Sequence, residues 1–182
     1  GIVGFAREVA GILGQKFVEP DFIRGLNFKA QSNKTVKVEI QDPEVCEHYA
    51  AAVFDISEIL KNPKLTIAKT YLLRSGMRPI DSITDLANEL MLETGQPLHT
   101  FDFDKLVKIN GSENIKITVR KAFENEELEL SDGKKIKMNN QDIVIAVGEN
   151  AETAVALAGA MGGASTAIDE NTTRILVESA TF

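Results

Sequence analysis

The chain has 182 residues, which is enough to bury the core of one domain, and its 43% hydrophobic and 26% charged content is typical of a globular protein. No apolar run is long enough to cross a membrane, and a net charge of −7 argues against a protein whose whole surface binds nucleic acid. One cysteine, Cys46, excludes an internal disulfide and fits a reducing, cytoplasmic setting.

The first segment of the chain is predicted to be helical. Residues 1–14 have the spacing of an amphipathic helix that ends at Gly14, and residues 17–33 have no sustained period and are expected to be a connector. The chain starts without a Met inside this helical pattern and stops after an apolar run, which indicates a piece of a longer protein. We therefore expect residues 1–33 to belong to a preceding region and residues 34–182 to form the main domain.

Two strands and a helix are expected next. Residues 35–40 alternate apolar and polar side chains, as a strand does. Residues 49–56 are also expected to be a strand, although their run of alanines would suit a helix as well. Residues 63–75 are predicted to be a helix with Pro63 at its start.

A clearer helix follows. Asp81 or Ser82 can cap its first turn, and Ser82 with Asp85 resembles a capping box. Apolar residues then share one face until Gly95, which is expected to end the helix.

Strands dominate the second half of the chain. Asp132 and Gly133 lie between two short runs and predict a hairpin over residues 128–138. Because helices collect in the first half, the sequence predicts an α+β fold with a β-sandwich-like core and flanking helices, not alternating βαβ units. The other expected strands are residues 115–120, 142–147, 155–160 and 175–177.

The residues alone give few signs of metal or nucleophile chemistry. His99 is one of two histidines, and it follows a Gly-Gln-Pro turn, where a packed ring is the commoner role. His48 lies near Cys46, but no second Cys–His pair follows at ligand spacing, so we expect no metal site. Cys46 has no evident base nearby, which favours a small packed side chain over a nucleophile.

Two further features have both a structural and a functional interpretation. The run A-G-A-M-G-G-A-S at residues 158–165 is either a tight turn or a place where bare backbone approaches a ligand, and the residues favour neither. Glu178 follows three apolar residues; it is either an exposed strand end, which is the commoner case, or a carboxylate bordering a cleft.

Several motifs together resemble the beta subunit of bacterial phenylalanyl-tRNA synthetase, at its B3/B4 region. They agree with that family in order and spacing over the whole chain. The motifs are Y-A-A at 49–51, G-M-R-P-I at 76–80, Asp85, Asn88, M-L-E-T-G-Q-P-L-H-T-F-D at 91–102, A-G-A-M-G-G at 158–163, E-N-T-T at 170–173 and L-V-E-S-A at 176–180.

The resemblance implies an editing domain. In that family this region hydrolyses the ester of tyrosine wrongly attached to tRNA(Phe), and the whole enzyme joins phenylalanine to that tRNA. The implied partners are the aminoacylated end of tRNA(Phe) and an alpha subunit, in an assembly of two alpha and two beta subunits. ATP and magnesium would act at sites outside this chain, so no cofactor is expected here.

The resemblance also assigns site residues. Glu178 matches the residue that recognises the tyrosine hydroxyl, and His99 matches a histidine near the ester, so these two are the expected catalytic residues. Arg78 and Asn88 match residues that line the site. Gly162 matches a glycine that keeps the pocket open.

The chain departs from the family pattern at several places. Ala87 stands where the family commonly has threonine, Glu89 where it has tyrosine, and Thr100 where it has alanine. The family's domain also continues past Phe182, so part of a pocket wall is expected beyond this residue. Ala87 keeps open an alternative, a non-catalytic module that holds tRNA or builds the subunit.

Overall fold

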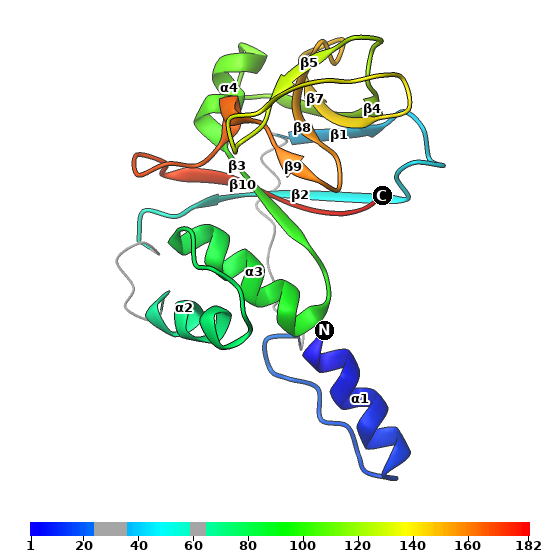
Figure 1. Ribbon diagram of the computed structural model, residues 1–182, viewed down its shortest axis with the longest axis vertical. Helices are drawn as coiled ribbons and strands as arrows, with labels where there is room; N and C mark the ends of the chain where they lie inside the picture. Colours follow the sequence, from blue (N-terminus) through cyan, green and yellow to red (C-terminus); the bar gives the residue numbers. More distant parts are fainter. Residues whose placement is uncertain (24–35, 59–64) are drawn as a thin grey trace. The chain divides into compact units, whose positions relative to one another are not determined.

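The computed structural model describes residues 1–23, 36–58 and 65–182 (Figure 1). The chain divides into two compact units, residues 1–33 with 63–98 and residues 34–62 with 99–182. Residues 63–98 thus group with residues 1–33, and the expected division into a preceding region and a main domain at residue 33 stays a prediction. Among the described helices, none combines the length and apolar character needed to span a membrane.

Helices make up the described secondary structure of the first unit. They are α1 (Ile2–Ile12), α2 (Leu65–Arg74) and α3 (Ser82–Thr94), and α3 packs against the other two. Leu72 of α2 and Ile83 of α3 are buried, and the two helices contact each other. The three predicted helices are confirmed, while Pro63 and part of the expected connector lie outside the described residues.

The ends of α3 follow from local chemistry. The Oδ1 atom of Asp81 accepts hydrogen bonds from the backbone N–H groups of Ile83 and Thr84, at 2.9 and 2.8 Å. Asp81 is therefore the cap, and the expected Ser82–Asp85 capping box is wrong, because Asp85 accepts from the backbone N–H of Ile80 instead. Gly95 ends the helix with a φ of 86°, a left-handed conformation that favours glycine.

Two sheets form most of the second unit. The five-stranded sheet has the order β1-β4-β7-β8-β9, and the three-stranded sheet has the order β2-β10-β3. In the larger sheet β1 and β4 are parallel, and the later pairs are antiparallel. The strands are β1 (Val36–Ile40), β2 (His48–Asp55), β3 (Leu98–Asp102), β4 (Ile115–Lys121), β7 (Ile143–Val147), β8 (Thr153–Leu157), β9 (Met161–Gly162) and β10 (Arg174–Thr181).

The main core lies between these two sheets. Phe101 and Leu176 from the three-stranded sheet pack in one cluster with Ile117 and Ile145 from the five-stranded sheet. Helix α4 (Phe103–Asn110) adds Leu106 to the same cluster. We call the face of the three-stranded sheet that carries Phe101 and Leu176 its inner face.

A hairpin covers the other side of the five-stranded sheet. β5 (Glu127–Glu129) pairs with β6 (Lys135–Lys137), and the predicted Asp132-Gly133 turn joins them. Leu128 and Met138 from this region pack with Val144 of β7 in a second buried cluster. Burial on both faces explains why β7 reads as a continuous apolar run instead of an alternating one.

The α+β fold and its sandwich-like core are confirmed, and residues 49–56 form a strand. Four described elements were not predicted: β3, α4, β9 and a short 3₁₀ turn, η2 (Ala164–Thr166). The strand expected at residues 175–177 is longer than predicted, because β10 pairs with β2 over eight residues.

The capping of α3 generates a stability prediction. Asp81→Ala removes the side-chain acceptor for two backbone N–H groups, so we expect the free energy of unfolding to fall by about 1 kcal/mol. Urea unfolding measures this change. Ser82→Ala is the matched control and is expected to cost less than about 0.5 kcal/mol; a larger loss for Ser82→Ala than for Asp81→Ala contradicts the assignment of the cap.

Candidate functional site

His99 lies on the inner face of the three-stranded sheet. Side chains two residues apart on a strand share a face, so His99 lies on the same side of β3 as the core residue Phe101. The two rings meet edge to face, with centroids 4.5 Å apart. This packing fixes the imidazole at the margin of the core.

Glu178 lies on the same face, one strand away. It is two residues from the core residue Leu176 on β10, and β10 lies next to β3 in the sheet. The residue is 5% exposed, so an exposed strand end is excluded. His99 and Glu178 therefore lie on one face of the three-stranded sheet.

Gly162 comes against the ring of His99. A Cβ atom placed on Gly162 would lie 2.6 Å from both Cε1 and Nε2 of His99, which is closer than carbon atoms approach. Pairing of β9 with β8 and a 2.9 Å hydrogen bond from Ser131 N–H to Gly162 O hold this backbone in place. The missing side chain thus makes room for the imidazole.

The neighbouring glycine has a different role. A Cβ on Gly163 would lie 2.5 Å from the backbone oxygen of Val155, and Gly163 N–H donates to that same oxygen at 2.8 Å. Gly163 therefore allows two backbone segments to meet. Of the two interpretations of the glycine run, Gly163 fits a tight structural approach, while Gly162 borders a side chain of the candidate site.

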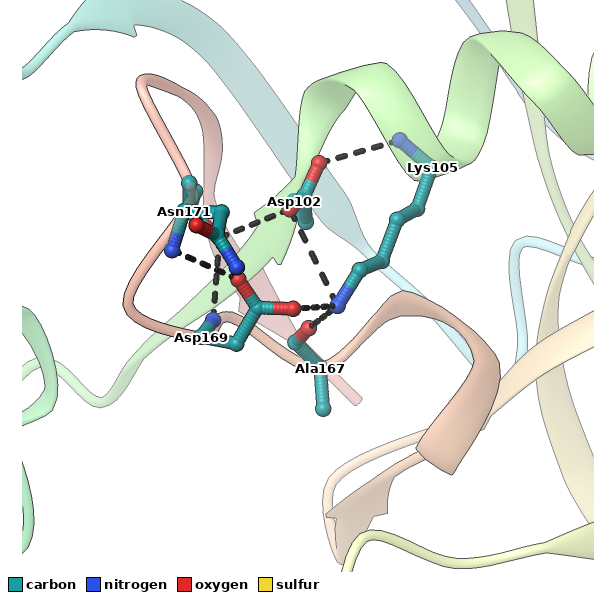
Figure 2. A network of polar contacts seen from close by, with 6 residues as sticks. Asp102, Lys105, Ala167, Asp169 and Asn171 are labelled. Atoms are coloured by element: carbon teal, nitrogen blue, oxygen red, sulfur yellow. Dashed lines mark hydrogen bonds and ion pairs between the residues drawn. The ribbon is translucent and has the colours of Figure 1, made fainter.

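A polar network ties the end of β3 to the loop that leads into β10 (Figure 2). The buried Asp102 caps α4 through the backbone N–H of Lys105, at 2.9 Å, and accepts a 2.7 Å hydrogen bond from Thr172 Oγ1. Lys105 Nζ donates to the carbonyl of Ala167 and to Asp169, at 2.6 and 2.7 Å. The strand bearing His99 and the segment preceding Glu178 are therefore joined directly.

Burial sets the charge of His99. Removal of the ring from water lowers the pKa of His99 to about 4, because the cationic form loses its hydration. The imidazole is therefore neutral at pH 7. A neutral ring offers one N–H donor and one nitrogen acceptor, which suits it to orient a polar group rather than to take up a proton.

Glu178 is shifted in the opposite direction. Burial raises the pKa of Glu178 to about 7, and a hydrogen bond from Tyr49 partly offsets this shift. The donor is the hydroxyl Oη of Tyr49, 3.0 Å from Oε2 of Glu178. Burial and the charge of Glu178 also raise the pKa of Tyr49, which keeps the phenol protonated as a donor.

Tyr49 is the site residue that sequence reasoning missed. Y-A-A at residues 49–51 helped to identify the family resemblance, but nothing in its spacing placed the phenol beside Glu178.

Arg78 is exposed before α3 and Asn88 is half-buried on α3, both in the first unit. Their convergence with the residues of the second unit, and the roles assigned to all five site residues, stay predictions.

The chain has relatives of known family. The B3/4 domain model matches residues 45–182. Phenylalanine–tRNA ligase beta subunits of Synechocystis and Anaeromyxobacter dehalogenans are 35% and 40% identical over 181 and 182 residues, which is 100% and 99% of this chain. The chain spans about a fifth of these relatives, 21% of each.

A solved structure shares the fold. It is an N-terminal fragment of the phenylalanyl-tRNA synthetase beta subunit from Pyrococcus horikoshii. The match covers 80% of this chain and 43% of that chain, with a TM-score of 0.50 and 9% sequence identity. At this identity the likeness concerns the fold.

The raised pKa of Glu178 predicts a pH-dependent stability. The folded chain holds the proton more tightly than the unfolded chain, since the pKa rises from 4.5 to about 7. The resulting stabilisation is complete below pH 4.5 and is lost as the pH rises through about 7. We expect the contribution of Glu178 to be about 3 kcal/mol. Glu178→Gln should remove it and leave the opposite pH dependence that the lowered pKa of His99 predicts.

Urea unfolding at pH 5 and pH 8 measures the effect. Glu170→Gln, at an exposed glutamate, serves as the control and should keep the parent's pH dependence. An identical pH dependence in Glu178→Gln and the parent would show that Glu178 titrates normally.

Proposed function

The chain belongs to the B3/4 domain family, and we propose that it edits tRNA(Phe) by hydrolysing the ester of wrongly attached tyrosine. It would do so as part of a phenylalanine–tRNA ligase, because its curated relatives are named as beta subunits of that enzyme. The observation that carries this proposal is a buried carboxylate, Glu178, that already accepts a hydrogen bond from a phenol, that of Tyr49.

The Tyr49–Glu178 contact has the chemistry that recognition of tyrosine requires. A tyrosine side chain differs from phenylalanine by one hydroxyl, and a buried carboxylate is a strong acceptor for it. Sites built to hydrogen-bond a substrate hydroxyl reject the analogue that lacks it by as much as ~10⁴-fold, because the buried polar group is left without that partner. Phenylalanine bound beside Glu178 would leave the carboxylate short of one donor.

The low pKa of His99 supports positioning rather than general base catalysis. A base whose pKa is about 4 holds almost no proton at pH 7, so it is a weak acceptor for the proton of an attacking water. As a neutral ring, His99 can orient the ester or the terminal ribose by a hydrogen bond. We propose that the water is held by backbone N–H groups and by the terminal hydroxyl of the tRNA itself.

Gly162 keeps space beside His99. Because an added Cβ would overlap the imidazole, any larger side chain must displace the ring or fill the space next to it. Arg78 and Asn88 complete the proposed lining of the site. The further proposed partners are the alpha subunit and the aminoacylated end of tRNA(Phe), in the cytoplasm, with ATP and magnesium acting elsewhere in the ligase.

One substitution favours a second candidate function. Ala87, half-buried on α3, cannot offer the hydroxyl of the threonine that commonly stands there. A module that only holds tRNA would tolerate this loss. Deacylation of tyrosyl-tRNA(Phe) by the assembled ligase separates the two functions: hydrolysis that disappears when residues of this chain are changed supports editing, and its absence from the parent ligase supports the non-catalytic module.

Glu178→Ala tests the recognition of the hydroxyl. Loss of a charge-assisted hydrogen bond is expected to slow tyrosyl-tRNA(Phe) hydrolysis by about 10- to 100-fold. Phenylalanyl-tRNA(Phe) has no hydroxyl to lose, so its slower hydrolysis should change little and the ratio of the two rates should shrink. Equal losses for both substrates contradict the role of Glu178 in recognition.

Gly162→Trp tests the space beside His99. The indole overlaps the imidazole and occupies the adjoining space, so editing by the assembled ligase should fall by at least about 100-fold while phenylalanine attachment stays near the parent rate. Gly11→Trp is the matched control, because nothing lies within 4 Å of an added Cβ on this α1 residue. Clearance of tyrosyl-tRNA(Phe) at the parent rate in Gly162→Trp would show that this glycine does not border the pocket.

A further inference from the structure

Tyr49 and Glu178 form a polar pair set by strand register. In the antiparallel pairing of β2 with β10, Tyr49 lies opposite Ala180 and Glu178 lies opposite Ala51. Tyr49 and Glu178 are therefore diagonal neighbours on the inner face, a separation that an aromatic side chain can span. Tyr49 and Ala51 both pack against the main core, which holds the phenol beside the carboxylate.

The hydrogen bond makes the two carboxylate oxygens of Glu178 inequivalent. Oε2 accepts from Tyr49 Oη at 3.0 Å. An ionised carboxylate has two oxygens and about four acceptor positions, so Oε1 is left for a second donor. Among the residues that the structure describes, Tyr49 is the one hydrogen-bond donor to this group, and a fixed donor on one oxygen restricts rotation of the carboxylate and thereby orients the other oxygen.

We propose that Tyr49 is a positioning residue for specificity: its hydroxyl holds Oε2 of Glu178 and reserves Oε1 for the phenol of the bound tyrosine. This inference rests on the proposed editing function and adds a residue that the family resemblance did not assign to the site. The same bond also favours the ionised form of Glu178, the form that accepts most strongly.

Few groups near Glu178 titrate in the same pH range, so its own titration can be measured. On β2 the facing titratable group is Tyr49, and Cys46 lies just before this strand with its thiol pKa raised, chiefly by burial and then by Glu178. On β3 the group is His99, which is neutral above about pH 5 because its pKa is about 4. The main core on this side of the sheet includes Ile117, Ile145 and Val147 of the five-stranded sheet, which carry no charge.

Tyr49→Phe separates a positioning role from simple packing, because it keeps the ring and removes the hydroxyl. The measured quantity is the ratio of tyrosyl- to phenylalanyl-tRNA(Phe) hydrolysis by the assembled ligase between pH 5.5 and 9. In the parent this ratio should rise as Glu178 ionises, with a midpoint near its pKa of about 7. In Tyr49→Phe the midpoint should move up by about one pH unit, and the ratio at pH 7 should fall several-fold.

Tyr71→Phe is the matched control. Tyr71 is the other of the chain's two tyrosines and lies exposed on α2, so its loss of a hydroxyl should leave the midpoint unchanged. A fluorinated tyrosine at position 49 supplies a second test if Tyr49→Phe folds poorly. Fluorination makes the phenol a stronger donor, so the midpoint should move down, a change of sign that ring packing does not predict.

The outcomes distinguish this inference from the function on which it rests. If Glu178→Gln abolishes the pH dependence while Tyr49→Phe leaves the midpoint in place, Tyr49 has no positioning role and the editing proposal stands. If Glu178→Gln keeps both the pH dependence and the selectivity, Glu178 does not recognise the hydroxyl, and the inference about Tyr49 is overturned with it. Opposite shifts for Tyr49→Phe and the fluorinated tyrosine support the inference.

Discussion

The central place of β10 in the three-stranded sheet is the constraint on which the candidate site depends. β10 pairs with β2 on one side and lies beside β3 on the other. Because the pairing with β2 runs over eight residues, a slip of one residue would turn Glu178 from the core to the opposite face. The register thus buries Glu178 and places it against the phenol of Tyr49. It also sets Glu178 on the side of the sheet that His99 of the neighbouring β3 shares.

The second unit buries charge in two different ways. Arg120 and Glu126 form a two-pronged ion pair at 2.7 and 2.8 Å, and Arg120 Nε donates to the carbonyl of Ala151. Such a saturated pair satisfies the groups it buries and leaves little capacity for a ligand. Glu178 instead receives one phenol donor in an apolar wall. A buried carboxylate whose pKa is raised in this way is a candidate for a binding group.

The site combines groups whose charges burial has moved in opposite directions. His99 becomes a weaker base than a free histidine, and Glu178 a weaker acid than a free glutamate. Both effects come from the same apolar core between the two sheets. In the proposed function, Glu178 therefore recognises the tyrosine hydroxyl and His99 orients the ester or the terminal ribose. The hydrolytic water is held by backbone N–H groups and by the tRNA.

The sequence by itself determined the elements whose signals are local. Alternation predicted β4, the Asp132-Gly133 pair predicted the hairpin, and Gly95 marked the end of α3. Motifs shared with a family also named His99, Gly162 and Glu178. Tertiary structure decided β3 and α4, because segments of five and eight residues are too short for periodicity to distinguish. It alone placed Tyr49 against Glu178 and His99 against Gly162, since strand pairing and burial join residues that are far apart in the chain, and no local pattern records those contacts.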